Sequence, residues 1–219
     1  MITQSYIDFF EGLATNNTKE WFHAHKDEYE QQVKEPFLGL LASLLPQLQV
    51  WEPLIPDDPK SALFRINRDL RFSKDKTPYL TVMKAGFSPG GKKSELPGFY
   101  LGIDAESIHV GGGLFGLKGP VLKQVRTSIA AEPQAFRQML DASAFKERFG
   151  ELKGETTSRL PAEIQAAAQT VPELAHKQFY AMAKLPLAQH LNDEQLPQVI
   201  LSYFEAIQPL NAFLKKAFV

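Results

Sequence analysis

The stretch GFYLGIDAESIHV, residues 98–110, decides the fold class of this chain of 219 residues. It contains two runs, 98–104 and 106–110, whose apolar and aromatic residues are typical of β-strands. Between the runs, Asp104 to Ser107 are predicted to form a hairpin turn. Because so short a connection can join only antiparallel neighbours, the stretch predicts an antiparallel sheet.

Further strands are predicted on both sides of this hairpin. Residues 80–87 form one candidate strand, and residues 64–72 form another because apolar and polar side chains alternate there with a period of two. The segment KQFYAMAKL, residues 177–185, predicts a fifth strand, with a helix as the alternative. The sheet is therefore expected to have four or five strands.

Helices are predicted before and after the sheet. Apolar residues recur every three or four positions across residues 2–13, and Asn17 with Glu20 resembles a capping box that opens a second helix. A C-terminal helix is predicted from about Asp193. We therefore expect one α+β domain, residues 1–219, with N-terminal and C-terminal helices packed on a mainly antiparallel sheet.

The composition excludes several classes of protein. Hydrophobic residues make up 44% of the chain and charged residues 22%, which is ordinary for a globular domain, and the net charge of -1 gives no support for a general nucleic-acid or membrane-surface binder. The absence of cysteine excludes disulfides, thiol catalysis and thiolate metal sites. The start resembles no signal peptide, and no apolar run has membrane-spanning length, so a cytoplasmic location is predicted.

Charge is unevenly distributed along the chain. Residues 61–96 carry eight Lys and Arg against three Asp and Glu, whereas residues 1–60 carry four against ten. Either the acidic part and the basic part attract each other, or the basic part binds an anion.

The basic part is concentrated in RINRDLRFSKDKTPY, residues 65–79. If the period-two alternation forms a strand, Arg68 lies on its apolar face, and a buried arginine requires a partner. That partner would be a helix carboxylate, with Glu20, Asp27 and Glu28 as the candidates, or an anionic ligand. Cations in this number could hold a phosphate or carboxylate group, and arginine supplies the bidentate geometry.

We therefore predict a site for a small anionic ligand at residues 65–79, near the Trp21 helix and a following glycine loop. The candidate ligand-binding residues are Arg65, Arg68, Asp69, Arg71, Lys74, Lys76, Tyr79, Trp21, Lys26, Gly112 and Gly113. The alternative is a structural or protein-interaction module in which the same charges form an internal ion-pair network. Catalysis is left open: Asp69 or Asp75 would be the base in the motif, but a carboxylate stabilised by cations is a poor base.

Other sites are disfavoured by their sequence context. GGGLFG, residues 111–116, contains the dinucleotide-binding spacing, but hairpin strands precede it, so the glycines are expected to serve a bulge or a close backbone approach. His23 and His25 would point to nearly opposite sides of a helix and could not chelate one metal ion. No cofactor or metal is predicted, and nucleic acid is an unlikely partner because no aromatic residues alternate with the cations on the polar face.

Two longer motifs carry a resemblance to a known family. NNTKEWFHAHKDEYEQQVKEPF (16–37) and RINRDLRFSKDKTPY (65–79), followed by GFYLGID and VGGGLF, resemble the domain-of-unknown-function 2461 family of bacterial and fungal proteins. The resemblance extends over nearly the whole chain and implies no particular activity. The lysine that this family tends to show after the Pro-Tyr pair is replaced here by Leu80.

Overall fold

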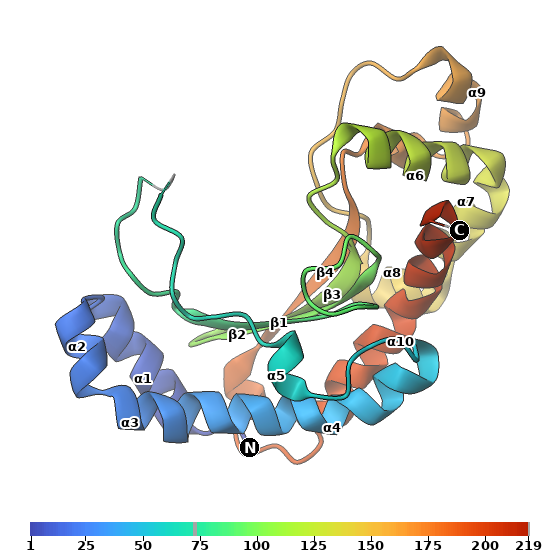
Figure 1. Cartoon of the computed structure of the whole chain (residues 1–219). Coiled ribbons are helices and arrows are strands. Elements are labelled where there is room, and N and C mark those ends of the chain that lie inside the picture. The colour runs from blue at the N-terminus through green and yellow to red at the C-terminus, as the bar shows by residue number, and fades with distance from the viewer. Residues whose placement is uncertain (72–73, 219) are drawn as a thin grey trace. The chain divides into compact units, whose positions relative to one another are not determined.

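The computed structural model describes residues 1–71 and 74–218 (Figure 1). The chain forms two compact units, each built from three segments. Unit 1 comprises Met1–Lys92, Tyr100–His109 and Lys184–Leu201, and unit 2 comprises Lys93–Phe99, Val110–Ala183 and Ser202–Val219. The expectation of one domain over residues 1–219 stays a prediction.

Four strands form an antiparallel sheet in the order β1-β2-β3-β4, which confirms the predicted α+β class. The bounds of the strands are Val82–Phe87 (β1), Gly98–Asp104 (β2), Ser107–Leu114 (β3) and Phe179–Pro186 (β4). Strand β4 agrees with the strand alternative for residues 177–185. Strand β3 extends beyond the predicted end at residue 110 and includes the glycine run that was expected to be a loop.

The predicted strand over residues 64–72 is wrong for the residues that the structure describes. Among its described residues only one isolated antiparallel bridge occurs, Asn67 with Tyr79, and a second bridge, Leu63 with Ala85, lies just before it. Phe72 lies outside the described residues. The physical reason is that the chain pairs with β1 only at its start and then turns back on its own residues. The period-two pattern therefore belongs mostly to a loop.

The predicted turn between β2 and β3 is present and is held by one side chain. The carboxylate Oδ1 of Asp104 accepts hydrogen bonds from the backbone N–H groups of Glu106 and Ser107, at 2.8 and 2.7 Å. Its Oδ2 lies 2.8 Å from Nε2 of His109. Although partial burial disfavours the charged form, these hydrogen bonds lower the pKa of the Asp104 carboxyl.

Helices from the N-terminal part of the chain build most of unit 1. They are α1 (Gln4–Thr15), α2 (Lys19–Ala24), α3 (Lys26–Glu28), a π-helical turn (Tyr29–Lys34), α4 (Glu35–Trp51) and α5 (Pro59–Ala62), with a 3₁₀ turn at Leu187–His190. The capping box predicted from Asn17 and Glu20 is wrong, because Thr18 is the N-cap of α2 and its hydroxyl accepts from the Trp21 N–H. The Asn17 side chain does not cap the helix and instead bonds the backbone of Tyr79, as described below.

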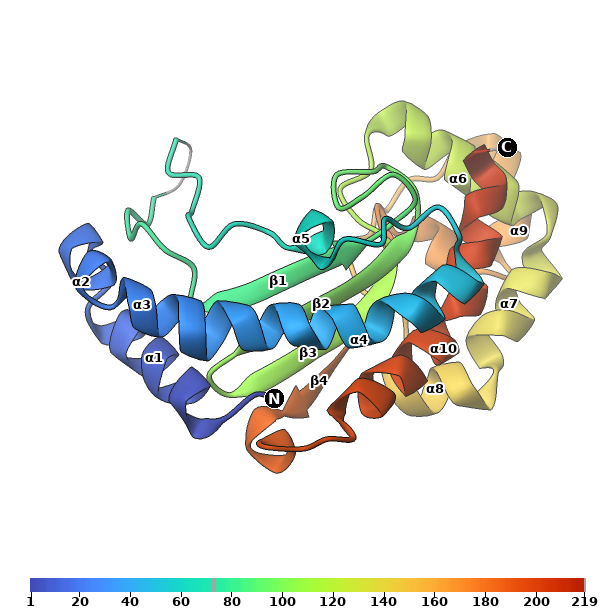
Figure 2. The ribbon, with the colours of Figure 1, turned by 60° about the horizontal axis from the view of Figure 1, so that its bottom comes forward.

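The core of unit 1 forms where α1 and α4 bury their apolar stripes. Helix α4 packs on β1, whose residues alternate between buried and half-buried positions (Figure 2). Phe9 of α1 contacts Phe10 and Tyr29, with ring centroids 5.6 and 5.7 Å apart. The buried Tyr6 hydroxyl donates to the Ile103 carbonyl at 2.9 Å, which ties α1 to β2. Burial of this apolar surface is the main stabilising term of the unit.

Unit 2 contains the helices that follow β3. They are α6 (Gly119–Ala131), α7 (Pro133–Asp141), α8 (Ser143–Phe149) and α9 (Gln165–Ala168), with 3₁₀ turns at Ala162–Ile164, Pro172–Ala175 and Lys216–Phe218. Helix α10 (Leu196–Lys215) begins in unit 1 and continues in unit 2. Its Phe204 and Phe213 contact Phe99 and Phe136, with ring centroids 5.0 and 5.1 Å apart. No helix of the described residues is long and apolar enough to cross a bilayer.

The glycine run in β3 allows the close approach that was predicted for it. A Cβ atom at Gly111 or Gly113 would lie 2.1 or 2.2 Å from a carbonyl oxygen of β4, and Gly113 has a φ of +116°. A Cβ atom at Gly112 would lie 2.5 Å from the Gly98 carbonyl oxygen. The backbone of β3 therefore occupies the space that side chains would need.

We predict that Gly113→Ala destabilises the protein more than Gly116→Ala does. Both glycines have positive φ, but a Cβ atom at Gly116 would meet nothing within 4 Å. Gly116→Ala should lower the free energy of unfolding by about 1 kcal/mol, and Gly113→Ala by at least about 3 kcal/mol because a backbone clash adds to the strain. Urea denaturation measures both values, and equal losses would show that the close approach is unimportant.

Candidate functional site

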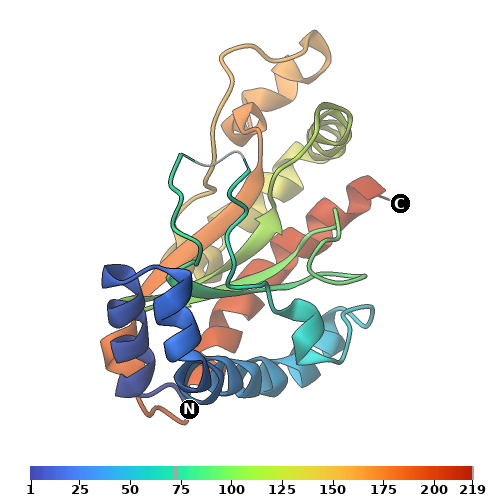
Figure 3. The same ribbon diagram turned by 60° about the vertical axis from the view of Figure 1, so that its left-hand side comes forward.

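The charged motif forms a hairpin-like loop, residues 66–80, in unit 1. Two backbone hydrogen bonds close it, from the Leu80 N–H to the Ile66 carbonyl at 2.8 Å and from the Arg68 N–H to the Pro78 carbonyl at 2.9 Å. Figures 1 and 3 show the loop extending from the start of β1 on the side away from α4. The motif is thus displayed at the surface of unit 1.

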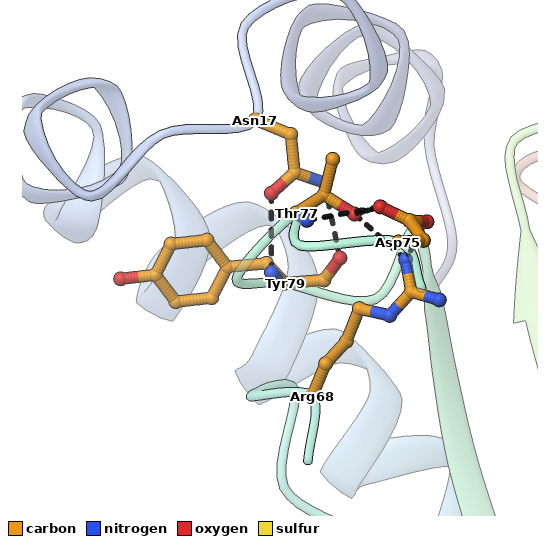
Figure 4. A network of polar contacts seen from close by, with 5 residues as sticks. All are labelled: Asn17, Arg68, Asp75, Thr77 and Tyr79. Atoms are coloured by element: carbon orange, nitrogen blue, oxygen red, sulfur yellow. Dashed lines mark hydrogen bonds and ion pairs between the residues drawn. The ribbon is translucent and has the colours of Figure 1, made fainter. Parts of the chain in front are cut away.

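The base of the loop is attached to the connection between α1 and α2. The side-chain amide of Asn17 donates to the Tyr79 carbonyl at 3.0 Å and accepts from the Tyr79 N–H at 3.1 Å (Figure 4). The Tyr79 ring is buried and stacks on Phe22, with the ring centroids 4.0 Å apart and an interplanar angle of 15°. Tyr79 therefore holds the loop in place and is not displayed to a ligand.

Arg68 pairs within the motif, with Asp75 and Thr77. Its Nη1 donates to a carboxylate oxygen of Asp75 and, at 2.7 Å, to the hydroxyl of Thr77 (Figure 4). The other Asp75 oxygen accepts from the N–H and the hydroxyl of Thr77, at 2.9 and 2.8 Å. With 27% of its side chain exposed, Arg68 is only half-buried. The predicted burial on an apolar face is thus only partly present.

A second arginine of the motif is also paired locally. The Nε and Nη2 of Arg71 donate to the two carboxylate oxygens of Asp69, at 3.0 and 2.6 Å, which is a bidentate pair. The Lys76 ammonium donates to the Leu70 carbonyl at 3.0 Å, so its contact neutralises no charge. Each carboxylate of the motif is therefore paired with one arginine.

These contacts lower the pKa values of both aspartates. The pKa of Asp75 falls to about 2, mainly because the Thr77 backbone N–H and hydroxyl donate to it and then because Arg68 does. Hydrogen bonds from Arg71 lower the pKa of Asp69 as well. Both groups are charged at neutral pH, and neither is suited to act as a general base.

Positive charge remains in the loop after this pairing. Residues 65–79 contain five Lys and Arg against two Asp. Within the described part of the chain, Arg65 and Lys74 form no ion pair, and both are exposed. The loop therefore presents two cations that form no ion pair with a described residue, although Asp69 attracts Arg65 at longer range, on a backbone that Tyr79 and Arg68 hold in place.

The helix residues predicted to join the site do so only in part. Trp21 stacks on His25 at 3.9 Å between ring centroids and contacts Phe9 at 5.5 Å, so it belongs to the helix packing. It is Phe22, the next residue, that contacts the loop. Lys26 is exposed, and its side chain has no hydrogen bond or ion pair among the described residues. Gly112 and Gly113 belong to unit 2, where the packing described above accounts for them.

The predicted helix partners of Arg68 are wrong. Glu20, Asp27 and Glu28 are exposed, and Arg68 pairs with Asp75, seven residues along the chain. A local signal for this existed, since Asp75 two residues before Thr77 is typical of an Asx turn. The contact of Asn17 with Tyr79 could not be predicted from a local pattern, because the two residues are 62 positions apart in the sequence.

We predict that Arg68→Met destabilises the protein more than Arg71→Met. Arg68 connects Asp75 and Thr77 across the loop, whereas the Arg71 side chain is 77% exposed. The expected loss of unfolding free energy is about 1 kcal/mol for Arg68→Met, and Arg71→Met should leave the unfolding free energy close to that of the wild type because its ion pair is exposed to solvent. Urea denaturation gives the values, and limited proteolysis should cleave the Arg68 variant faster within residues 66–80. An Arg68 variant as stable and as resistant as the wild type would contradict the role of Arg68.

We also predict that Thr77→Val raises the pKa of Asp75 from about 2 towards about 3.9. The variant removes the hydroxyl donor and keeps the backbone donor. Because the pKa of Asp75 is lower in the folded state, its contribution to stability is present above about pH 4 and is lost as the pH falls towards 2. An NMR titration of the carboxyl carbons measures the shift, with Asp69 as the internal control. An unchanged midpoint for Asp75 would contradict the prediction.

Comparison with known proteins identifies the family of this chain. Comparison with curated proteins gives no match. The model of a family described as "Conserved hypothetical protein (DUF2461)" matches residues 5–213, which include the loop and both helices that hold its base. The chain therefore belongs to the DUF2461 family.

Proposed function

We propose that the loop of residues 66–80, together with Arg65, binds a small anionic ligand that carries a phosphate or carboxylate group. The observation that carries this proposal is the charge surplus of residues 65–79, where two aspartates are each paired with an arginine and Arg65 and Lys74 are not paired with any described carboxylate. We also propose a cytoplasmic location, because the sequence contains no cysteine and so lacks the disulfides that are typical of secreted proteins.

The division of labour within the loop supports the proposal. Arg68 and Asp75 act as positioning residues, because their contacts with each other and with Thr77 hold the loop backbone. Arg65, Lys74 and Lys76 then supply the charge. Their side chains are exposed, so an anion can reach them without first separating an existing ion pair. A preorganised cationic loop loses less conformational entropy on binding than a disordered one.

A structural role for the charges is the second candidate, and a specific observation favours it. Arg68 and Arg71, the two arginines best suited to a bidentate contact, are already occupied by aspartates of the same loop. In this alternative the network only fixes the shape of the loop, either to stabilise unit 1 or to dock a protein partner. Catalysis remains open in both versions.

The double variant Arg65→Ser/Lys74→Ser tests the proposal. We expect inorganic phosphate to shift the backbone amide resonances of residues 66–80 in an NMR titration of the wild-type protein. Each charge-assisted hydrogen bond contributes about 1.5 to 3 kcal/mol, so the double variant should bind phosphate at least roughly tenfold more weakly. Its stability should be unchanged, because neither side chain pairs with a described residue.

The matched control is Lys19→Ser/Lys93→Ser, which removes the same charge from exposed positions outside the loop. This control should bind phosphate like the wild type at constant ionic strength. Equal weakening in both double variants would indicate general electrostatic attraction. No loop shifts with phosphate, acetate or citrate in the wild type would leave the structural role as the better account.

A further inference from the structure

Unit 2 contains a buried arginine that has no acidic partner. Arg126, on α6, is only 8% exposed. Its Nη2 donates to two backbone carbonyls, those of Ala175 at 3.2 Å and His176 at 3.0 Å. Within the described ranges, no Asp or Glu forms an ion pair with it. Carbonyl dipoles supply only partial charge, so a full positive charge is buried without compensation.

A second arginine in the same unit, Arg137, has its charge neutralised by two carboxylates. Arg137, on α7, has its guanidinium 2.8 Å from the Glu173 carboxylate and 3.1 Å from that of Asp141. Both arginines contact the turn of residues 172–176, and the more deeply buried of the two is the one that lacks carboxylates. Burial accordingly lowers the pKa of Arg126.

Further donors around Arg126 are unsatisfied. The Nε of Arg126 and the Nδ1 of His176 are buried and have no hydrogen-bond partner. The two residues are already in contact, because Arg126 donates to the His176 carbonyl. A negatively charged oxygen beside these two nitrogens would accept hydrogen bonds from them and would also neutralise the charge of the guanidinium.

Residues 153–157 are hydrogen-bonded to the same turn and to the start of β4. The Thr157 N–H donates at 2.8 Å to the Ala175 carbonyl that Arg126 also uses, and the Lys177 N–H donates at 2.8 Å to the Glu155 carbonyl. A third bond, from the Lys153 N–H to the Tyr180 carbonyl, attaches the start of this segment. The segment contains no helix or strand and includes Gly154 at a φ of +121°. Its displacement must break these three backbone hydrogen bonds, which accompany isolated bridges of Lys153 with Tyr180 and of Thr156 with His176.

We infer that Arg126 and His176 form a second oxyanion site, which takes a carboxylate or phosphate group when residues 153–157 move aside. This site is separate from the one proposed for residues 65–79 and involves none of its residues. Its ligand would supply the negative charge that the protein itself does not place beside Arg126.

Thermal unfolding in sulfate and in chloride at equal ionic strength tests the inference. Sulfate keeps its charge between pH 5 and 8, so protonation of the probe does not complicate the result. We expect sulfate to raise the unfolding midpoint of the wild type by roughly 5 to 10 °C at about 100 times its dissociation constant. In the background of Arg65→Ser/Lys74→Ser, which removes anion binding by the loop, Arg126→Met should abolish this shift. In chloride Arg126→Met should unfold no earlier than the wild type because an uncompensated charge is removed.

Two control variants separate this site from the others. Arg137→Met should unfold earlier in both salts, because Glu173 loses its arginine and Asp141 keeps only Lys146, yet it should keep the sulfate shift. Arg65→Ser/Lys74→Ser should also keep the shift of the Arg126 site while losing the phosphate response of its own loop. The two variants therefore test the loop site and the Arg126 site independently, so that one proposal can fail while the other holds.

The outcome that overturns the inference is an Arg126→Met variant that unfolds early, like Arg137→Met, while sulfate stabilises it as much as the wild type. Arg126 would then be a structural clamp on the turn of residues 172–176. If Arg126→Met does not fold, crystals of the wild type soaked in selenate decide the question. An anomalous selenium peak beside Arg126 supports the site. If selenate binds at full occupancy elsewhere in the crystal but gives no peak beside Arg126, the inference is contradicted.

Discussion

The side-chain amide of Asn17 forms the two hydrogen bonds that a neighbouring strand would have formed with Tyr79. An amide group matches the peptide unit in donor and acceptor, so one residue between α1 and α2 can continue the pairing of the chain where no strand is present. The stack of Tyr79 on Phe22 excludes water from this junction. The position of the whole charged loop depends on this contact, because the loop otherwise pairs mainly with itself.

The loop also shows how charge can be arranged so that part of it organises the backbone and part of it remains exposed. Arg68 with Asp75 and Arg71 with Asp69 are local pairs, and exposed pairs of this kind contribute little free energy each. Their effect is geometric, because Arg68 connects the two described sides of the loop and Asp69 bonds both the backbone and the side chain of Arg71. Arg65 and Lys74 remain at its surface, and this difference in partners is the physical basis for proposing an anion site there.

Much of the fold could be predicted from local patterns. The turn at Asp104, the strands on either side of it and the amphipathic N-terminal helices follow from short-range periodicity and turn chemistry, and the structure contains them. The strand expected at residues 64–72 does not form, because alternation of apolar and polar residues does not reveal whether a partner strand is available. For Arg68 the pattern predicts either a helix carboxylate or an anionic ligand as the partner, whereas the structure pairs it with Asp75, seven residues along the chain.

The α+β class, the antiparallel hairpin, the charge surplus of residues 65–79 and the close backbone approach at the glycine run could all be predicted from local sequence, since each depends on neighbouring residues. Which groups meet over long separations could be learned only from the folded chain. Asn17 reaches Tyr79 across 62 residues, and Arg126 meets the carbonyls of Ala175 and His176 across 49 and 50. Such pairings depend on how helices and strands pack, and no local pattern of residues records that packing.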